Sequence, residues 1–325
     1  MSNPRLTTTS DLHAAAARIK GTVARTPLLD VSWTSTRAGQ TIWLKCENLQ
    51  VTGSFKIRGA FNMIARIPEA DRRRGVITYS SGNHAQAVAF AARAHETVAA
   101  VVMPENAPAV KVAGARRLGA EVVFEGTTSS ERRVRAERLA AERGLVMVPP
   151  FDHPDIVAGQ GTVGLEILND LPGVERVFVP VGGGGLLSGI AAAIKYARPA
   201  VEVVGVEPTG AAKMTASLRA GHPVTLGSVS SVADGLLPVR PGDLTFAHVR
   251  QFVDRVVTVD DEAIASAVSW LFRCAKLVVE PSGAAATAAA LASPVRPGDG
   301  PMVAVVSGGN VSSTMVVDLL GRSDE

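Results

Sequence analysis

Short apolar runs alternate with longer amphipathic segments along most of this chain. The runs predict buried strands, and the segments with helical spacing predict helices. The expected strands are 41–46, 76–79, 98–103, 121–124, 145–148, 176–181, 201–206, 256–259 and 302–306. The expected helices are 11–19, with Ser10 as cap, then 60–65, 85–94, 110–118, 130–143, 161–168, 186–196, 261–275 and 282–292, with an irregular stretch at 221–245. Strand and helix in alternation, with continuously apolar strands, predict parallel βαβ units and an α/β fold.

The amino-acid composition excludes some classes of protein. The chain has 325 residues, of which 46% are hydrophobic and 19% are charged, as in a soluble globular enzyme. Its 33 Lys and Arg against 30 Asp and Glu give a net charge of +3, too small for a nucleic-acid-binding surface. The Arg-rich segment 131–143 alternates Glu with Arg, which indicates a solvated helix face with local ion pairs.

The two cysteines and the N-terminal residues indicate in which cellular compartment the protein is expected. Cys46 and Cys274 stand in apolar runs and are interpreted as small core residues in a reducing environment. The first residues lack the apolar core of a secretory signal, and the most apolar window, 177–194, is broken by five glycines and Pro180. We therefore expect a cytoplasmic protein with no membrane partner.

Lys56 stands at a point where a turn-rich loop passes into a helix, in Gly53-Ser54-Phe55-Lys56-Ile57-Arg58-Gly59. Free N–H groups at a helix start attract anions, so a lysine there is misplaced unless an anionic group lies beside it. The residues alone leave two readings: a solvated lysine, or a lysine that forms a Schiff base with a phosphate-bearing aldehyde cofactor.

Gly182, Gly183, Gly184 and Gly185 lie between an apolar strand and the helix that begins near Leu186. Consecutive glycines let the backbone approach a ligand closely, and the helix start then favours a phosphate. The loop lacks the Gly-Lys-Ser/Thr of a nucleotide P-loop and the G-x-G-x-x-G of a dinucleotide site. A merely flexible loop is the alternative.

Two further loops follow expected strands. Ser80-Ser81-Gly82-Asn83-His84 leads into a helix, where backbone N–H groups could hold a substrate carboxylate, or where Ser81 or Asn83 could be a plain cap. Ser307-Gly308-Gly309-Asn310 follows the last strand, at the sheet edge where ligands of open α/β proteins bind.

Together these four segments, in this order and spacing, resemble the pyridoxal-phosphate (PLP) enzymes of fold type II, in the branch of threonine and serine dehydratases and serine racemases. The resemblance extends from about Leu12 to Leu320. It implies two open twisted sheets with the cofactor in the cleft between them. It also implies a large domain of residues 1–70 and 153–325, a small inserted domain of residues 71–152, and a homo-oligomer.

The resemblance implies a role for each site residue. Lys56 would hold PLP, Phe55 would line it, and Asn83 would contact its phenolic oxygen. The glycine loop and Leu186 would hold the phosphate, Ser307 would face the pyridine nitrogen, and Glu280 would lie near the ring. The substrate carboxylate would be bound by the backbone of Ser80, Ser81, Gly82, Asn83 and His84.

The implied reaction is dehydration of L-threonine, L-serine or a related β-hydroxy amino acid to a 2-oxo acid and ammonia. Lys56 would take the Cα proton, and the neutral Ser307 hydroxyl would favour β-elimination over transamination. Three alternatives stay open: a racemase with Lys56 and Ser81 as its two bases, a β-replacement enzyme, and a binding protein without catalysis. A substrate such as 3-hydroxyaspartate, or a hydroxylated diamino acid from ectoine breakdown, is a further variant.

Two departures from the family pattern stand out. Lys213 occupies the place of a second metal-binding carboxylate near Glu207, so we expect its ammonium to stand in for a metal. The racemase-type arginine expected near Ser130 aligns with Glu131, beside Arg132 and Arg133. A C-terminal regulatory domain is not expected, since the sequence ends at Glu325.

Overall fold

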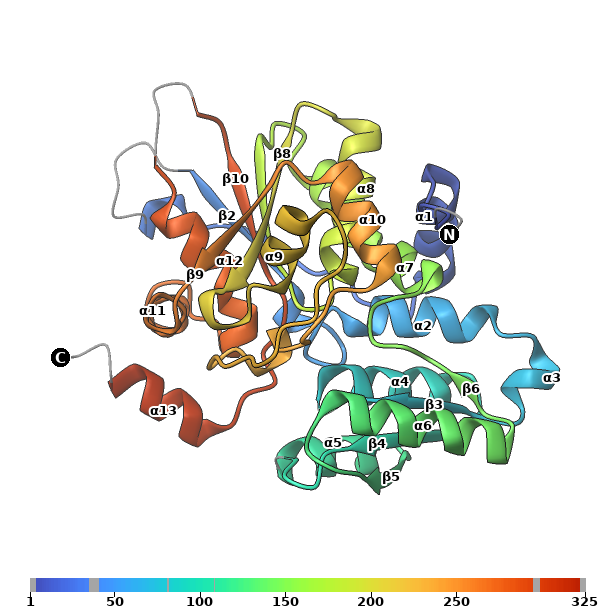
Figure 1. Ribbon diagram of the computed structural model, residues 1–325. Coiled ribbons are helices and arrows are strands. Elements are labelled where there is room, and N and C mark those ends of the chain that lie inside the picture. Colours follow the sequence, from blue (N-terminus) through green and yellow to red (C-terminus); the bar gives the residue numbers. More distant parts are fainter. Residues whose placement is uncertain (1–3, 35–40, 81, 108, 295–298, 322–325) are drawn as a thin grey trace.

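Two twisted sheets organise the chain, as seen in the computed structural model of residues 4–34, 41–80, 82–107, 109–294 and 299–321 (Figure 1). The larger sheet has the order β1-β2-β10-β7-β8-β9. Its strands are β1 (Leu28–Asp30), β2 (Ile42–Cys46), β7 (Arg176–Pro180), β8 (Glu202–Pro208), β9 (Arg255–Val259) and β10 (Met302–Val306). All neighbours pair in parallel except β1, which runs antiparallel to β2.

The smaller sheet is parallel throughout, with the order β5-β4-β3-β6. Its strands are β3 (Val76–Tyr79), β4 (Ala99–Met103), β5 (Glu121–Phe124) and β6 (Val146–Met147). The two sheets form separate halves in Figure 1, and α2 lies between them. The α/β fold with two sheets is therefore confirmed, while the domain limits at residues 71 and 152 stay a prediction.

Thirteen α-helices connect and cover the sheets within the described residues. They are α1 (Thr9–Ile19), α2 (Lys56–Arg66), α3 (Glu69–Arg72), α4 (Asn83–Ala94), α5 (Ala109–Arg117), α6 (Ser129–Arg143), α7 (Pro154–Asp170), α8 (Gly185–Ala197), α9 (Lys213–Ala220), α10 (Asp243–Phe252), α11 (Asp261–Arg273), α12 (Pro281–Ala292) and α13 (Ser313–Gly321). Four short 3₁₀ turns are η1 (Ser32–Thr34), η2 (Glu47–Leu49), η3 (Thr209–Ala211) and η4 (Asp234–Leu236).

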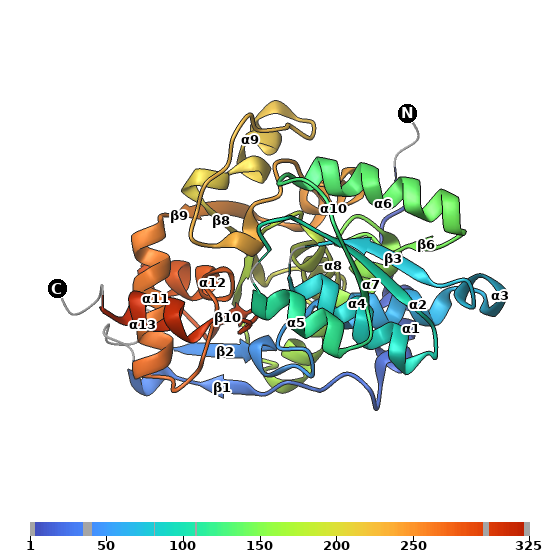
Figure 2. The same ribbon diagram turned by 90° about the horizontal axis from the view of Figure 1, so that it is seen from below.

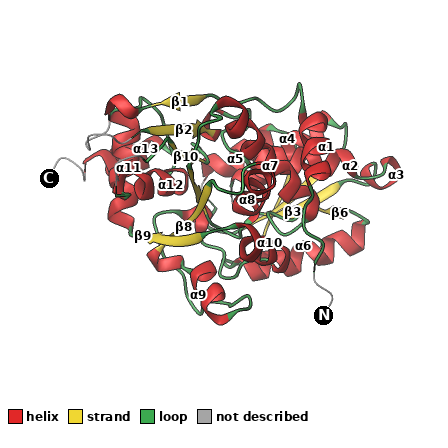
Figure 3. Cartoon of the chain, turned by 90° about the horizontal axis from the view of Figure 1, so that it is seen from above, coloured by secondary structure: helices red, strands yellow, loops and turns green. Residues whose placement is uncertain are grey.

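The core of the larger sheet follows from strand alternation. In β10, Met302, Ala304 and Val306 pack with α11 and α12, whereas Val303 and Val305 pack with α7, α8 and α10. Figure 3 shows these two helical layers on opposite sides of the strands. Burial on both faces explains why these strands read as continuous apolar runs.

The smaller sheet is covered in the same way. Val76 of β3 packs against residues of α2 and α4, while its neighbour Ile77 packs against Ala136 and Leu139 of α6. The loops that follow β2, β3, β7 and β10 all leave the carboxyl ends of their strands, where open α/β sheets bind ligands. Figure 2 shows the same arrangement turned by 90°.

Several boundaries differ from the prediction. Helix α1 starts before Ser10, because Thr8 and Asp11 form a reciprocal capping box. Helix α7 starts at Pro154 rather than 161, since His153 caps it and proline suits the first helical position. Helices α3, α9, α10 and α13 were not predicted; α9 and α10 flank or enter the stretch expected to be irregular.

Cys46 is buried, as predicted, but Cys274 is only partly buried. Among the described residues, no helix has both the length and the apolar character needed to cross a bilayer. Helix α6 carries the expected surface ion pairs, such as Arg133 with Glu137 and Arg143 with Glu121.

Candidate active site

A single pocket brings together residues from all four sequence segments. Its wall includes Lys56, Asn83, Glu280 and Ser307, together with the loop Gly182–Gly185. Phe55, Ser80, Gly82, His84 and Leu186 also line it. Ser81, the second base of the racemase alternative, lies outside the described residues. The predicted site residues that the structure describes are thus neighbours in space, although they are spread over 250 residues of sequence.

Lys56 is the first residue of α2, and the loop before it is pinned to the end of β10. The backbone N–H of Phe55 donates to the carbonyl of Ser307 at 3.1 Å, and Ser54 forms an isolated bridge with Gly308. These contacts fix where α2 begins. The lysine predicted from sequence and the Ser-Gly-Gly-Asn segment therefore form one local unit.

The Lys56 ammonium is held in the pocket by one backbone acceptor. Its Nζ donates to the carbonyl of Pro150 at 2.8 Å, on the segment between β6 and α7. Burial lowers the pKa of Lys56 to about 8, while the nearby Glu280 carboxylate works in the opposite direction. A larger fraction of this amine is neutral near pH 7 than for an ordinary lysine, and the neutral amine is the nucleophilic form.

The loop Gly182–Gly185 needs its glycines because other groups occupy the space of a side chain. A Cβ on Gly183 would lie 2.3 Å from the ring of Phe151, and one on Gly184 would lie 2.9 Å from Thr245. Gly184 also has a φ of +100°, in the left-handed region that favours glycine. These contacts give the glycines a packing role, which argues against a merely flexible loop.

Helix α8 begins at Gly185, the last residue of this loop. Among the described residues, no side chain caps its first turn. The Thr245 hydroxyl donates to the carbonyl of Gly183 at 2.7 Å and so holds the loop from behind. Free N–H groups and the helix dipole together make this turn a site for an anion such as a phosphate.

Helix α4 offers a second helix start to the pocket. Within the described chain, its first turn also lacks a side-chain cap, although Asn83 was a candidate for that role. The Asn83 amide instead donates to Glu280 Oε1 at 2.5 Å and accepts from Asn310 Nδ2 at 2.8 Å. This chain of contacts joins α4 of the smaller sheet to the loop after β10 of the larger sheet.

His84, the second residue of α4, is neutral in this setting. Burial, with a smaller contribution from the Lys56 ammonium, lowers its pKa to about 3. Its Nε2 lies 3.0 Å from the carbonyl of Val148, which as an acceptor requires the proton on Nε2. The Nδ1 atom then carries a lone pair and is buried without a partner among the described residues.

Glu280 and Ser307 close the pocket on the side of β10. Burial and the carboxylate of Asp234 raise the pKa of Glu280 to about 7, against the opposing effects of Lys111, Asn83 and Lys56. Ser307 is buried, and its hydroxyl donates weakly to the carbonyl of Ser282 at 3.4 Å. The pocket thus contains a carboxyl group with an unusual pKa and a neutral hydroxyl.

Among the pocket residues that the sequence analysis did not assign to the site, three are charged: Lys111, Arg132 and Asp234. Lys111 of α5 forms an ion pair with Asp234 of η4 across the pocket, joining the two halves of the molecule. Arg132 was assigned to the solvated face of its helix, but only 8% of it is exposed and its Nε has no hydrogen-bond partner among the described residues. The spacing of Arg132 with the buried Ala136 and Leu139 was the signal that could have identified it.

Lys213 is fully buried next to the glycine loop. Its Nζ donates to the carbonyls of Val181, Ala211 and Leu236 at 2.8, 3.0 and 2.9 Å. The same atom lies 3.3 Å from Glu207 Oε1. Burial lowers the pKa of Lys213, and the Glu207 carboxylate opposes that shift.

Comparison with known proteins agrees with this geometry. Residues 19–308 match the family model described as pyridoxal-phosphate-dependent enzyme. An L-threonine ammonia-lyase of Thermotoga maritima is 45% identical over 97% of this chain and 78% of its own. An L-threo-3-hydroxyaspartate ammonia-lyase of Saccharomyces cerevisiae is 38% identical over 98% of both chains. The solved structure of maize serine racemase superimposes with a TM-score of 0.92, at 37% identity and 98% coverage of both chains.

This chain therefore belongs to the family of pyridoxal-phosphate-dependent enzymes. The pocket fits that cofactor on chemical grounds. The open first turn of α8 suits the phosphate, and the Lys56 amine suits the aldehyde. Buried polar atoms without partners among the described residues, His84 Nδ1, Gln160 Nε2 and Arg132 Nε, belong to residues that line the same pocket and leave hydrogen-bonding capacity for ligands or water.

The lowered pKa of Lys56 can be tested on the apoenzyme. Capture of PLP by the amine requires its neutral form, so the capture rate should rise about tenfold per pH unit below the pKa and level off above it. The midpoint is expected at about pH 8. Stopped-flow absorbance across a pH series measures it, with Lys56→Arg as the control. A midpoint near the ordinary lysine value of 10.5 would contradict the account.

Proposed function

We propose that this protein is a PLP-dependent ammonia-lyase. It would convert L-threonine or L-serine, by Cα deprotonation and loss of the β-hydroxyl, to a 2-oxo acid and ammonia. The observation that carries the proposal is the placement of the Lys56 amine in one pocket with the open starts of α8 and α4. The first helix start suits a phosphate, and the second suits the carboxylate of an amino acid. The Thermotoga maritima relative carries the corresponding name.

We assign the contacts with the cofactor to the residues that line the pocket. Gly182–Gly185 and Leu186 would bind the phosphate, with Phe55 against the cofactor and Ser307 facing the pyridine nitrogen. Asn83, held between Glu280 and Asn310, would donate to the phenolic oxygen. When bound, PLP withdraws electrons from the substrate Cα and makes its proton acidic.

Substrate binding and proton transfer fall to the helix starts and to Lys56. The first-turn N–H groups of α4, with the loop from Ser80 to His84, would hold the substrate carboxylate. The neutral Lys56 amine would take the Cα proton, because its lowered pKa leaves it a usable base near neutral pH. The neutral Ser307 hydroxyl places no full negative charge at the pyridine nitrogen.

Product analysis tests the proposed reaction. The holoenzyme is incubated with L-threonine and with L-serine, and 2-oxo acid, ammonia and D-amino acid are all measured. The proposal predicts 2-oxobutyrate from L-threonine as the main product, in equal amount to ammonia. D-amino acid as the main product would favour the racemase alternative. Ser81→Ala then serves as a check, because loss of the second base should abolish racemisation and leave elimination in place.

A second substrate is favoured by one observation. Arg132 lines the pocket and is buried. Its Nη1 donates to the Thr127 carbonyl at 3.2 Å, but its Nε has no hydrogen-bond partner among the described residues. A buried guanidinium with free donors is costly unless a ligand satisfies it, and a carboxylate is its natural partner. A β-hydroxy amino acid with an acidic side chain, such as 3-hydroxyaspartate, would supply that carboxylate. The yeast relative is named for this substrate.

Arg132→Met separates the two substrates. A hydrogen bond to a charged group contributes about 1.5–3 kcal/mol, so kcat/KM for threo-3-hydroxyaspartate should fall roughly 10- to 100-fold. The value for L-threonine should change little. Arg133→Met is the matched control, because the neighbouring Arg133 is exposed and pairs with Glu137. Equal loss on both substrates would contradict a role in side-chain recognition.

Lys213 is proposed to replace a metal ion near the phosphate loop. Its ammonium already engages three carbonyl oxygens and the Glu207 carboxylate, a set of hard oxygen donors of the kind that binds a cation. One of these carbonyls belongs to Val181, directly before Gly182. The ammonium would therefore fix the glycine loop without an added ion.

The metal-replacement proposal predicts that a chelator leaves activity unchanged. Activity on L-threonine is compared in EDTA and in magnesium, after dialysis against chelator. We expect equal rates, while Lys213→Ala should lose activity and regain part of it with added magnesium or ammonium. Loss of wild-type activity in EDTA, reversed by magnesium, would refute the proposal.

We also propose three wider properties. They are a cytoplasmic location, a homo-oligomer, and a small inserted domain of residues 71–152. Cell fractionation, sedimentation and limited proteolysis would check them in turn.

A further inference from the structure

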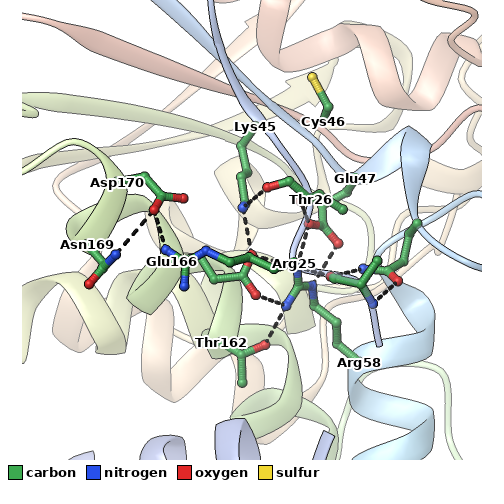
Figure 4. A network of polar contacts seen from close by, with 12 residues as sticks. Arg25, Thr26, Lys45, Cys46, Glu47, Arg58, Thr162, Glu166, Asn169 and Asp170 are labelled. Atoms are coloured by element: carbon green, nitrogen blue, oxygen red, sulfur yellow. Dashed lines mark hydrogen bonds and ion pairs between the residues drawn. The ribbon is translucent and has the colours of Figure 1, made fainter. Parts of the chain in front are cut away.

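A cluster of four buried charges lies beside the first turn of α2. It consists of Lys45 from β2, Glu47 from η2, Arg58 from α2 and Glu166 from α7, and we call it the α2 charge cluster (Figure 4). The side chains of Lys45, Glu47 and Arg58 are 0% exposed, and that of Glu166 is 15% exposed. Two cations and two carboxylates make the cluster electrically neutral. None of the four lines the pocket described above.

Arg58 is the centre of this cluster. Its Nε and Nη2 each donate to a Glu47 carboxylate oxygen at 2.8 Å. Its Nη1 and Nη2 donate to the two oxygens of Glu166 at 2.7 and 2.9 Å, and Nη1 also reaches the Thr162 hydroxyl at 3.1 Å. A planar guanidinium that bridges two carboxylates in this way is fixed in position and orientation.

Lys45 completes the neutral cluster. Its Nζ donates to Glu166 Oε2 at 2.6 Å and to the carbonyl of Thr26 at 2.7 Å. Burial alone would lower the pKa of Arg58, but Glu47 and Glu166 raise it above its ordinary value. Removing any one charge would leave an unbalanced charge in a dry environment, which is strongly unfavourable.

The cluster and the pocket lie on different sides of α2. Arg58 follows Lys56 by two residues, and a helix turns by about 100° per residue, so their side chains leave the helix roughly 200° apart. The cluster therefore cannot act on the Lys56 amine by contact. It can act through the backbone of the first turn, because that turn carries both side chains.

The first turn of α2 also depends on tertiary contacts for its placement. Its cap residue, Phe55, makes no side-chain capping bond. The turn lies against α7 at glycines: a Cβ on Gly159 would be 2.6 Å from the Arg58 carbonyl, and one on Gly59 would be 2.5 Å from Gln160 Nε2. Glycine contacts let the two helices approach closely but do not fix their rotation, whereas the bond from Arg58 to Glu166 does.

We propose that Arg58 is a positioning residue for Lys56: the α2 charge cluster fixes the rotation of the first turn of α2 and hence the direction in which the Lys56 amine enters the pocket. This inference rests on the proposed role of Lys56 as the cofactor-binding lysine. The alternative is a purely structural cluster, which would change stability alone.

Arg58→Lys tests the proposal because it keeps the charge and removes the planar fork. Lysine cannot bridge two carboxylates in the same geometry. A misplacement of about 1 Å can cost on the order of 100-fold in rate. We therefore expect kcat to fall by on the order of 100-fold, with KM changed little. The apoenzyme should also bind PLP more weakly, and the pH midpoint of the bound cofactor's visible absorption band should move.

A milder variant keeps the test decisive if Arg58→Lys does not fold. Thr162→Val is nearly isosteric and removes one neutral hydrogen-bond partner of Arg58. Such a hydrogen bond contributes about 1 kcal/mol, so kcat should fall roughly fivefold. Arg25→Met is the matched control, because Arg25 pairs with Asp170 beside the cluster, as Figure 4 shows, and its side chain is 55% exposed. The control should leave PLP affinity, absorption and kcat unchanged.

The outcomes separate this inference from the proposed function. If the melting temperature falls in both cluster variants while PLP affinity, the absorption midpoint and kcat stay at wild-type values, the cluster is structural and the inference is wrong. If wild-type protein does not bind PLP at Lys56, the proposed function fails first. Absorption and PLP affinity do not depend on which amino acid is the substrate.

Discussion

Two cations stand in the first turn of α2, where the free N–H groups of a helix make positive charge unfavourable. Arg58 is compensated by two buried carboxylates, Glu47 and Glu166. Among the described residues, Lys56 has no carboxylate in direct contact; burial instead lowers its pKa and favours the neutral amine. The rest of the site depends on this difference, because it keeps one cation fixed and makes the other reactive.

The elements around this turn connect the two sheets at the point where the chemistry takes place. Helix α2 carries Lys56 and packs on α7 and α4, while Asn83 of α4 reaches Glu280 and the segment after β10. Lys111 and Asp234 add a second connection across the pocket. Any movement of one sheet relative to the other would therefore change the surroundings of Lys56 directly.

Much of this could be predicted from the sequence. Continuous apolar runs identify buried parallel strands, and the α/β fold that they predict is confirmed by the structure. The family and its cofactor follow from the resemblance of four segments to known enzymes, and the comparisons confirm both. The roles given to Asn83, Glu280 and Ser307 remain proposals, although the structure brings these residues into one pocket.

The parts that could not be predicted depend on tertiary contacts. Arg132 was assigned to a charged surface because its neighbours in sequence are charged, and only the packing of α6 on the smaller sheet buries it. Arg58 and Glu47 read as ordinary charges until β2, α2 and α7 bring their partners together. Helix α7 was predicted to start at residue 161 but starts at Pro154, and its glycines Gly159, Gly161 and Gly164 allow close contact with α2 and α8.

The most direct test of the account is the identity of the lysine that holds the cofactor. The holoenzyme is treated with borohydride, which fixes PLP to its lysine, and the modified peptide is located by mass spectrometry. If Lys56 holds the cofactor, the label should be found on Lys56 alone and should be lost in Lys56→Arg. Label on the buried Lys45 or Lys213, label on the partly buried Lys111, or no label at all would contradict this assignment.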